Sequence, residues 1–206
     1  MERYRLKDFF KDATDIVAVN FLFLLAVILS SGILFGAAFK ALFAVTFKIM
    51  GHQDATRIWK DFWTAFIDSF WFSTLVWLIS VVFGLMFAFV IDYGLNHQMI
   101  WLAASGIVSA IFLILYLLYF FPMLSIFKTK SRIQMLKNAA IMGASHPFSS
   151  LLLAGGLVMV FILFEWWTGT LLFSIGLMSV INAAHLNRLF YPYLEPFKDQ
   201  QNNEQI

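Results

Sequence analysis

Charged residues occur along this chain in short clusters, and long apolar stretches separate the clusters. Five windows of 22 to 35 residues carry no Asp, Glu, Lys or Arg: Ile16–Phe39, Ser69–Ile91, Tyr93–Phe127, Asn138–Phe164 and Trp166–Asn187. A transmembrane helix needs roughly 20 mostly apolar residues, so each window is long enough to cross a bilayer. The pattern predicts an all-α fold, a polytopic transmembrane helical bundle.

Two further stretches alternate apolar and charged residues at helical spacing. In Arg57–Phe70 the apolar residues recur every three or four positions and charged residues take the other face. In Ser131–Gly143, Ile133, Leu136 and Ala140 are expected to form the apolar face, and Ser131 and Gln134 have the spacing of a capping box. We predict two interfacial amphipathic helices; the alternative for either segment is a partner-binding helix.

The placement of the 14 Lys and Arg residues favours one topology. Cytoplasmic loops carry an excess of these residues. If Ile16–Met50 folds as a hairpin of two short helices, hinged near Ser30-Ser31-Gly32, all of them except Lys40 lie on the cytoplasmic side. We therefore predict about six membrane segments in the cell membrane, with both termini cytoplasmic. A half-inserted second arm and a five-span chain are the alternatives.

Composition excludes several protein classes. Apolar residues make up 61% of the chain and charged residues 13%, whereas a soluble domain has about 25% charged residues. The net charge of +2 does not favour nucleic acid, and the absence of cysteine excludes disulfides and cysteine–zinc sites. We expect residues 1–190 to form a single domain in the lipid bilayer, followed by a polar, disordered cytoplasmic tail at 191–206.

Polar residues inside apolar windows are the candidates for a functional site, because polar groups at membrane depth are costly. Lys40, Asn182 and His185 are such residues. Lys40 would bind an anion, or it would snorkel or pair with a carboxylate. Asn182 and His185 share one helix face and, with Asn20, would line a polar cavity. The alternative for this pair is an interhelical hydrogen bond.

No enzyme motif is present, and the four histidines are widely separated. We predict no catalytic residue, no cofactor and no metal site. A basic loop remains as a candidate partner-contact surface. It contains Lys128, Lys130, Arg132 and Lys137.

Four stretches together resemble the YesL-like family of small polytopic bacterial membrane proteins. They are the N-terminal segment broken near Ser31-Gly32, KDFWTAF at Lys60–Phe66, YFFP at Tyr119–Pro122 and LKNAAIMGASHP at Leu136–Pro147. The resemblance covers about residues 8–190. It implies a multi-span protein of the Gram-positive cell membrane without an assigned activity, commonly encoded beside carbohydrate uptake systems of the ATP-binding cassette (ABC) type.

The resemblance leads to our first functional hypothesis, a non-enzymatic accessory or assembly subunit of a carbohydrate ABC uptake system. Its helices would pack against the permease through small-residue faces such as Ser105-x-x-x-Ser109. The alternatives are a small-solute transporter or channel, or an ABC permease-like subunit that contacts its ATPase through Asn138–Ala144. A homo-oligomer is a further option.

Overall fold

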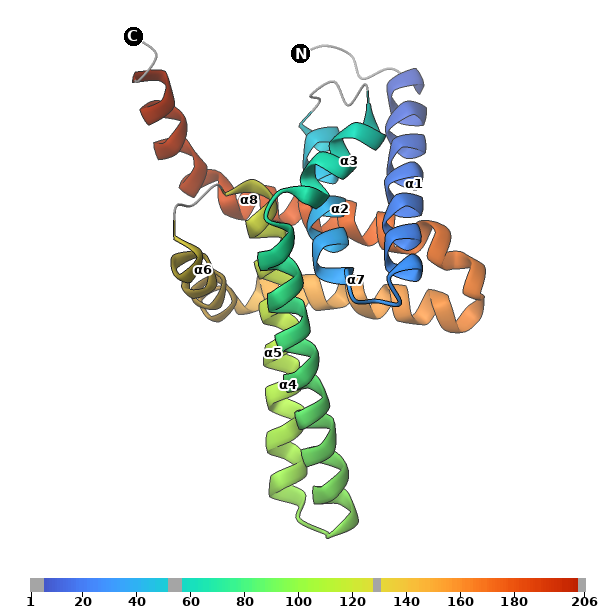
Figure 1. Ribbon diagram of the computed structural model, residues 1–206, viewed down its shortest axis with the longest axis vertical. Helices are drawn as coiled ribbons and strands as arrows, with labels where there is room; N and C mark the ends of the chain where they lie inside the picture. Colours follow the sequence, from blue (N-terminus) through green and yellow to red (C-terminus); the bar gives the residue numbers. More distant parts are fainter. Residues whose placement is uncertain (1–5, 52–56, 128–130, 204–206) are drawn as a thin grey trace.

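The computed structural model describes residues 6–51, 57–127 and 131–203, and this part of the chain consists of helices and short connections. The elements are α1 (Leu6–Leu29), α2 (Phe35–Met50), α3 (Ile58–Ile67), α4 (Phe70–Asn96), α5 (Ile100–Ile126), α6 (Arg132–Ser145), α7 (Pro147–Trp166), the 3-10 turn η1 (Thr168–Thr170) and α8 (Leu171–Asn203). The all-α prediction is confirmed (Figure 1).

Five segments of the described chain are long and apolar enough to cross a membrane. They are Phe10–Leu29, Phe70–Asn96, Ile100–Ile126, Pro147–Trp166 and Thr168–Phe190. This supports the predicted multi-pass membrane protein. The remaining apolar helix, α2, has 16 residues and is therefore about 24 Å long, short of the roughly 30 Å hydrocarbon core. The second arm of the first hairpin is thus too short for a full crossing.

The predicted hinge of the first hairpin is confirmed. The chain turns between α1 and α2, where Ser31 and Gly32 have φ angles of 50° and 82°. The indole nitrogen of Trp77 donates a hydrogen bond of 2.9 Å to the Gly32 carbonyl. Helix α4 is about 40 Å long, and Trp77 lies about 10 Å from its first residue. The turn therefore lies beside the first quarter of α4, and the hairpin does not follow α4 to its far end.

Helix α2 forms the centre of the molecule. Eleven of its sixteen residues are buried, and it contacts α1, α3, α4, α5 and α8. Small residues make this possible: a Cβ atom at Gly36 would lie 2.6 Å from the carbonyl oxygen of Ser73 in α4. The first hairpin thus contributes the core helix, and five other helices pack against it.

Helix α3 lies within the predicted amphipathic segment Arg57–Phe70 and buries Phe62 and Phe66. The helix does not continue into the next span, because the chain breaks between α3 and α4. Asp68 leaves the helical conformation, with ψ of 124°, and Ser69 takes a left-handed conformation with φ of 56°. The physical reason for the break is the polar contact at this junction described below.

The predicted start of α6 is confirmed, because the Ser131 hydroxyl accepts a hydrogen bond from the Gln134 backbone nitrogen. The sequence analysis did not name the side of this helix that packs on the protein, where Met135, Ala139 and Met142 are buried. Of the expected apolar face, Leu136 packs against the core, and Ile133 is exposed. Two apolar stripes run along this helix, and the methionines fit the protein side because their flexible side chains fill irregular gaps.

The two long hairpins point in different directions. Helices α4 and α5 run side by side and project away from the rest of the molecule, whereas α7 crosses their direction (Figure 1). The first turn of α1 and the last turn of α8 lie on the side opposite the tip of the α4–α5 hairpin (Figure 1). Which side faces the cytoplasm stays a prediction.

Helix α8 continues to Asn203. The segment 191–206, predicted to be a disordered tail, therefore has a helical backbone through Asn203. Residues 204–206 lie outside the described residues.

Candidate functional site

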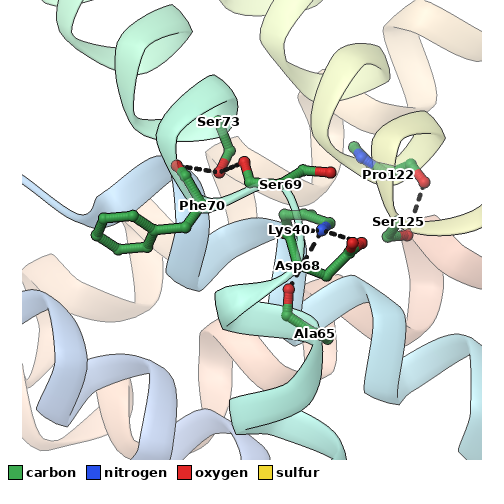
Figure 2. Close-up of polar contacts among 8 residues, drawn as sticks. All are labelled: Lys40, Ala65, Asp68, Ser69, Phe70, Ser73, Pro122 and Ser125. Carbon is green, nitrogen blue, oxygen red and sulfur yellow. Dashed lines mark hydrogen bonds and ion pairs between the residues drawn. The ribbon is translucent and has the colours of Figure 1, made fainter. Parts of the chain in front are cut away.

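Lys40 lies in α2 with 1% of its side chain exposed, and it points at the junction of α3 and α4 (Figure 2). Its ammonium Nζ donates to the Asp68 carboxylate Oδ2 at 2.8 Å and to the Ala65 carbonyl at 3.2 Å. It also donates to the Asp68 backbone carbonyl. A lysine ammonium has three N–H donors, and each has an acceptor here. Lys40 thus pairs with a carboxylate, and no donor is left for an external anion.

The partners of Lys40 explain where α3 ends. The last carbonyl groups of a helix have no intrahelical donor, and a cation at the C-terminus is favourable. Lys40 supplies both a donor and a charge to the end of α3. On the α4 side, the Ser73 hydroxyl lies 3.1 Å from the Ser69 carbonyl and 3.0 Å from that of Phe70 (Figure 2). The elbow between α3 and α4 is therefore hydrogen-bonded on both sides.

A second ion pair holds α3 to α2. Lys48 Nζ lies 2.9 Å from Asp61 Oδ1, with both side chains partly exposed. The two lysines of α2 thus engage one aspartate within α3 and one just after it. The sequence did not identify Asp61 or Asp68 as partners. Two lysines eight positions apart on one helix face, followed by two aspartates seven positions apart, are the pattern that would have suggested them.

Asn182 and His185 lie on α8, and both carry a buried atom without a hydrogen-bond partner among the described residues. Asn182 is 1% exposed, and its Nδ2 has no acceptor; the His185 Nε2 has no partner either. Asn182 packs closely on α7, because a Cβ atom at Gly156 would lie 2.9 Å from the Asn182 Oδ1. Asn182 and His185 therefore lie on one face of α8, as their spacing predicts, and the Asn182 side chain is closely packed against α7.

The other predicted members of this polar group lie elsewhere. The Asn20 Nδ2 donates a 2.8 Å hydrogen bond to the Leu171 carbonyl at the start of α8. Leu171 precedes Asn182 by about 16 Å along the helix. Lys40 is engaged at the end of α3. The structure therefore brings Asn182 and His185 together and places Lys40 and Asn20 at two separate positions.

A buried polar contact that the sequence did not reveal joins α2 and α8. The hydroxyl oxygens of Thr46 and Ser179 are 3.0 Å apart. Thr46 also donates to the Leu42 carbonyl at 2.8 Å, and Ser179 donates to the Gly176 carbonyl at 2.7 Å. Two hydroxyl hydrogens cannot serve three contacts at once. The contact between the two helices therefore competes with the two bonds inside them.

The basic loop is described only in part. Lys128 and Lys130 lie outside the described residues. The Arg132 guanidinium carbon lies 5.3 Å from the ring centroid of Phe72 in the first turn of α4, within the range of a cation–π interaction. Lys137 is exposed on α6.

Comparison with known proteins gives one match. The sequence model of a family described as "Protein of unknown function, DUF624" matches residues 16–93. The matched segment contains the turn of the first hairpin and the Lys40–Asp68 pair. No curated protein and no solved structure matches the chain.

Proposed function

We propose that this protein is a non-enzymatic accessory or assembly subunit that packs against the membrane subunits of a carbohydrate ABC uptake system. The observation that supports a packing role is a face of small residues on α5, at Ser105 and Ser109. The proposed partner rests on the resemblance of the four sequence stretches to the YesL-like family.

The two sides of α5 differ in what they contact. One side packs on α4 at very close range, since a Cβ atom at Gly94 would lie 2.6 Å from the Ala103 backbone nitrogen. Ser105 is exposed and Ser109 half-buried. Their hydroxyls are already bonded within the helix, each at 2.8 Å, to the carbonyls of Leu102 and Ser105.

This face suits another transmembrane helix. In lipid there is no hydrophobic force between helices, and small residues favour association because they let backbones approach closely. Hydroxyls that are satisfied within their own helix carry no desolvation cost when a partner covers them. A permease helix with a similar face would fit here.

Replacement of both serines by phenylalanine tests the proposal. The tagged protein is recovered in mild detergent after crosslinking, from cells that contain the carbohydrate importer. We expect the wild type and a Val82→Phe control, which also introduces a phenylalanine at an exposed position of α4, to recover importer subunits. The double variant Ser105→Phe, Ser109→Phe should lose them. Recovery of no importer subunit with the wild type, or equal recovery with the double variant, would contradict the proposal.

The unpartnered atoms of Asn182 and His185 support a second candidate, a small-solute transporter. Buried polar groups without partners inside a membrane domain mark possible solute pathways. Reconstituted vesicles test this candidate through solute flux, with Lys40→Met as a comparison because that ammonium is already engaged. Flux that survives Asn182→Leu and His185→Leu would exclude these side chains as a transport site.

A further inference from the structure

Helix α6 exposes an apolar stripe with a cation at its centre. Ile133, Lys137 and Ile141 follow one another at four-residue spacing and therefore lie along one helix face. Ile133 is 66% exposed and Ile141 is 61% exposed, and Lys137 is exposed as well. We name these three residues the outer stripe of α6. The opposite face of the helix is the buried methionine side described above.

Helix α6 lies near the end of the α4–α5 hairpin opposite its tip, which is where a surface helix would lie if this hairpin crosses the bilayer. Arg132 stacks on Phe72, near the start of α4, and Gly143 faces the ring of Tyr119 in the second half of α5. Both contacts lie toward the end of the hairpin opposite its tip. Figure 1 views α6 nearly along its axis, whereas α4 and α5 run within the plane of the picture. The helix therefore crosses the hairpin close to the end where α4 begins.

The charge of α6 is not compensated within the helix. It carries Arg132 and Lys137 and contains no Asp or Glu. Both ion pairs found in the described parts of the chain join α2 to α3 or its end, through Asp61 and Asp68. The two amphipathic helices thus differ, since carboxylates balance the lysines around α3.

We propose that the outer stripe of α6 binds an anionic phospholipid at the membrane surface. The two isoleucines would lie against the upper acyl chains, and the Lys137 ammonium would reach the headgroup phosphate along its own apolar stem. An interfacial helix buries its apolar face at this depth, and each cation near an anionic leaflet contributes about 1 kcal/mol. A water-soluble partner is disfavoured, because two largely exposed isoleucines flank the charge.

A single-cysteine variant tests this inference, because the native chain has no cysteine. Ile141→Cys in the full chain is labelled with a fluorophore and reconstituted with phosphatidylcholine and phosphatidylglycerol. Bromination of one lipid or the other then measures, by quenching, the preference of the labelled position for phosphatidylglycerol. We expect a preference that falls about five-fold in Lys137→Gln, the factor that corresponds to the loss of one surface cation.

Two matched variants separate this inference from general effects of charge. Lys137→Arg should retain the preference, and Lys60→Gln on α3 should leave it unchanged. Equal quenching by both lipids, or a preference that Lys137→Gln does not lower, would overturn the proposal. Quenching by aqueous iodide in place of brominated lipid would also overturn it and would identify the stripe as a surface for a soluble partner.

Discussion

The ion pair between Lys40 and Asp68 gives the sharpest prediction of stability. The change Lys40→Met keeps the length and apolar volume of the side chain and removes the ammonium. Two partly buried carbonyls, of Ala65 and Asp68, then lose their donor. At about 1 kcal/mol for each unsatisfied acceptor, the loss is about 2 kcal/mol. The Asp68 carboxylate adds little, because its side chain is 64% exposed and stays hydrated.

The reverse change, Asp68→Asn, should cost more although it alters an exposed residue. It leaves the Lys40 ammonium, which is 1% exposed, without its counter-charge. Removal of one partner from a buried pair costs about 3–5 kcal/mol, and the two remaining carbonyl acceptors place this case at the lower end. The double variant removes the buried charge as well, so its stability should return to that of Lys40→Met.

The assay is reversible unfolding of the four proteins in detergent micelles, followed by circular dichroism. Lys48→Met is the control, because its pair with Asp61 is partly exposed on both sides and should contribute less than about 1 kcal/mol. The test is the order of stability. Asp68→Asn should be the least stable variant, and Lys40→Met and the double variant should be equally stable. If Asp68→Asn were as stable as Lys48→Met, the Lys40 ammonium would have to be hydrated, and its role as a cap of α3 would be refuted.

Two further predictions concern helix packing. Gly94→Ala should destabilise the protein by about 1–3 kcal/mol, because the new Cβ would meet the Ala103 backbone at 2.6 Å. At the control position Gly84, on the same helix, a new Cβ meets nothing within 4 Å, so Gly84→Ala should stabilise the protein by up to about 1 kcal/mol. Equal effects of the two changes on the free energy of unfolding would contradict the close packing of α4 on α5. Asn182→Leu removes a buried donor without a partner, so the free energy of unfolding should stay the same or rise; a clear loss of stability would mean that the amide has a bonding partner.

Local patterns predicted most of the helices. Charge-free windows and three- to four-residue periodicity identify apolar and amphipathic helices from one stretch of sequence at a time. The turn at Gly32 was predicted for the same reason, because it depends on a residue that tolerates a positive φ angle.

Tertiary properties were harder to predict. The burial of α2 depends on the helices that surround it, and the pairing of Lys40 with Asp68 joins residues 28 positions apart. The side of α6 that is buried was not predicted, because that helix has two apolar stripes and only contact with α5 selects between them. The predicted polar cavity of Asn20, Asn182 and His185 did not form for a similar reason. The Asn20 side chain bonds to the Leu171 carbonyl instead, and this contact depends on how α1 crosses α8.

The central position of α2 has a consequence for biosynthesis. The ribosome releases α2 before α3, α4, α5 and α8, which later cover it. Until Asp68 emerges, the Lys40 ammonium has no counter-ion from that residue, and the insertion machinery must keep it hydrated. A chain truncated before α3, which lacks Asp68, should therefore leave the Lys40 ammonium without its counter-ion, and we expect membrane proteases to degrade it.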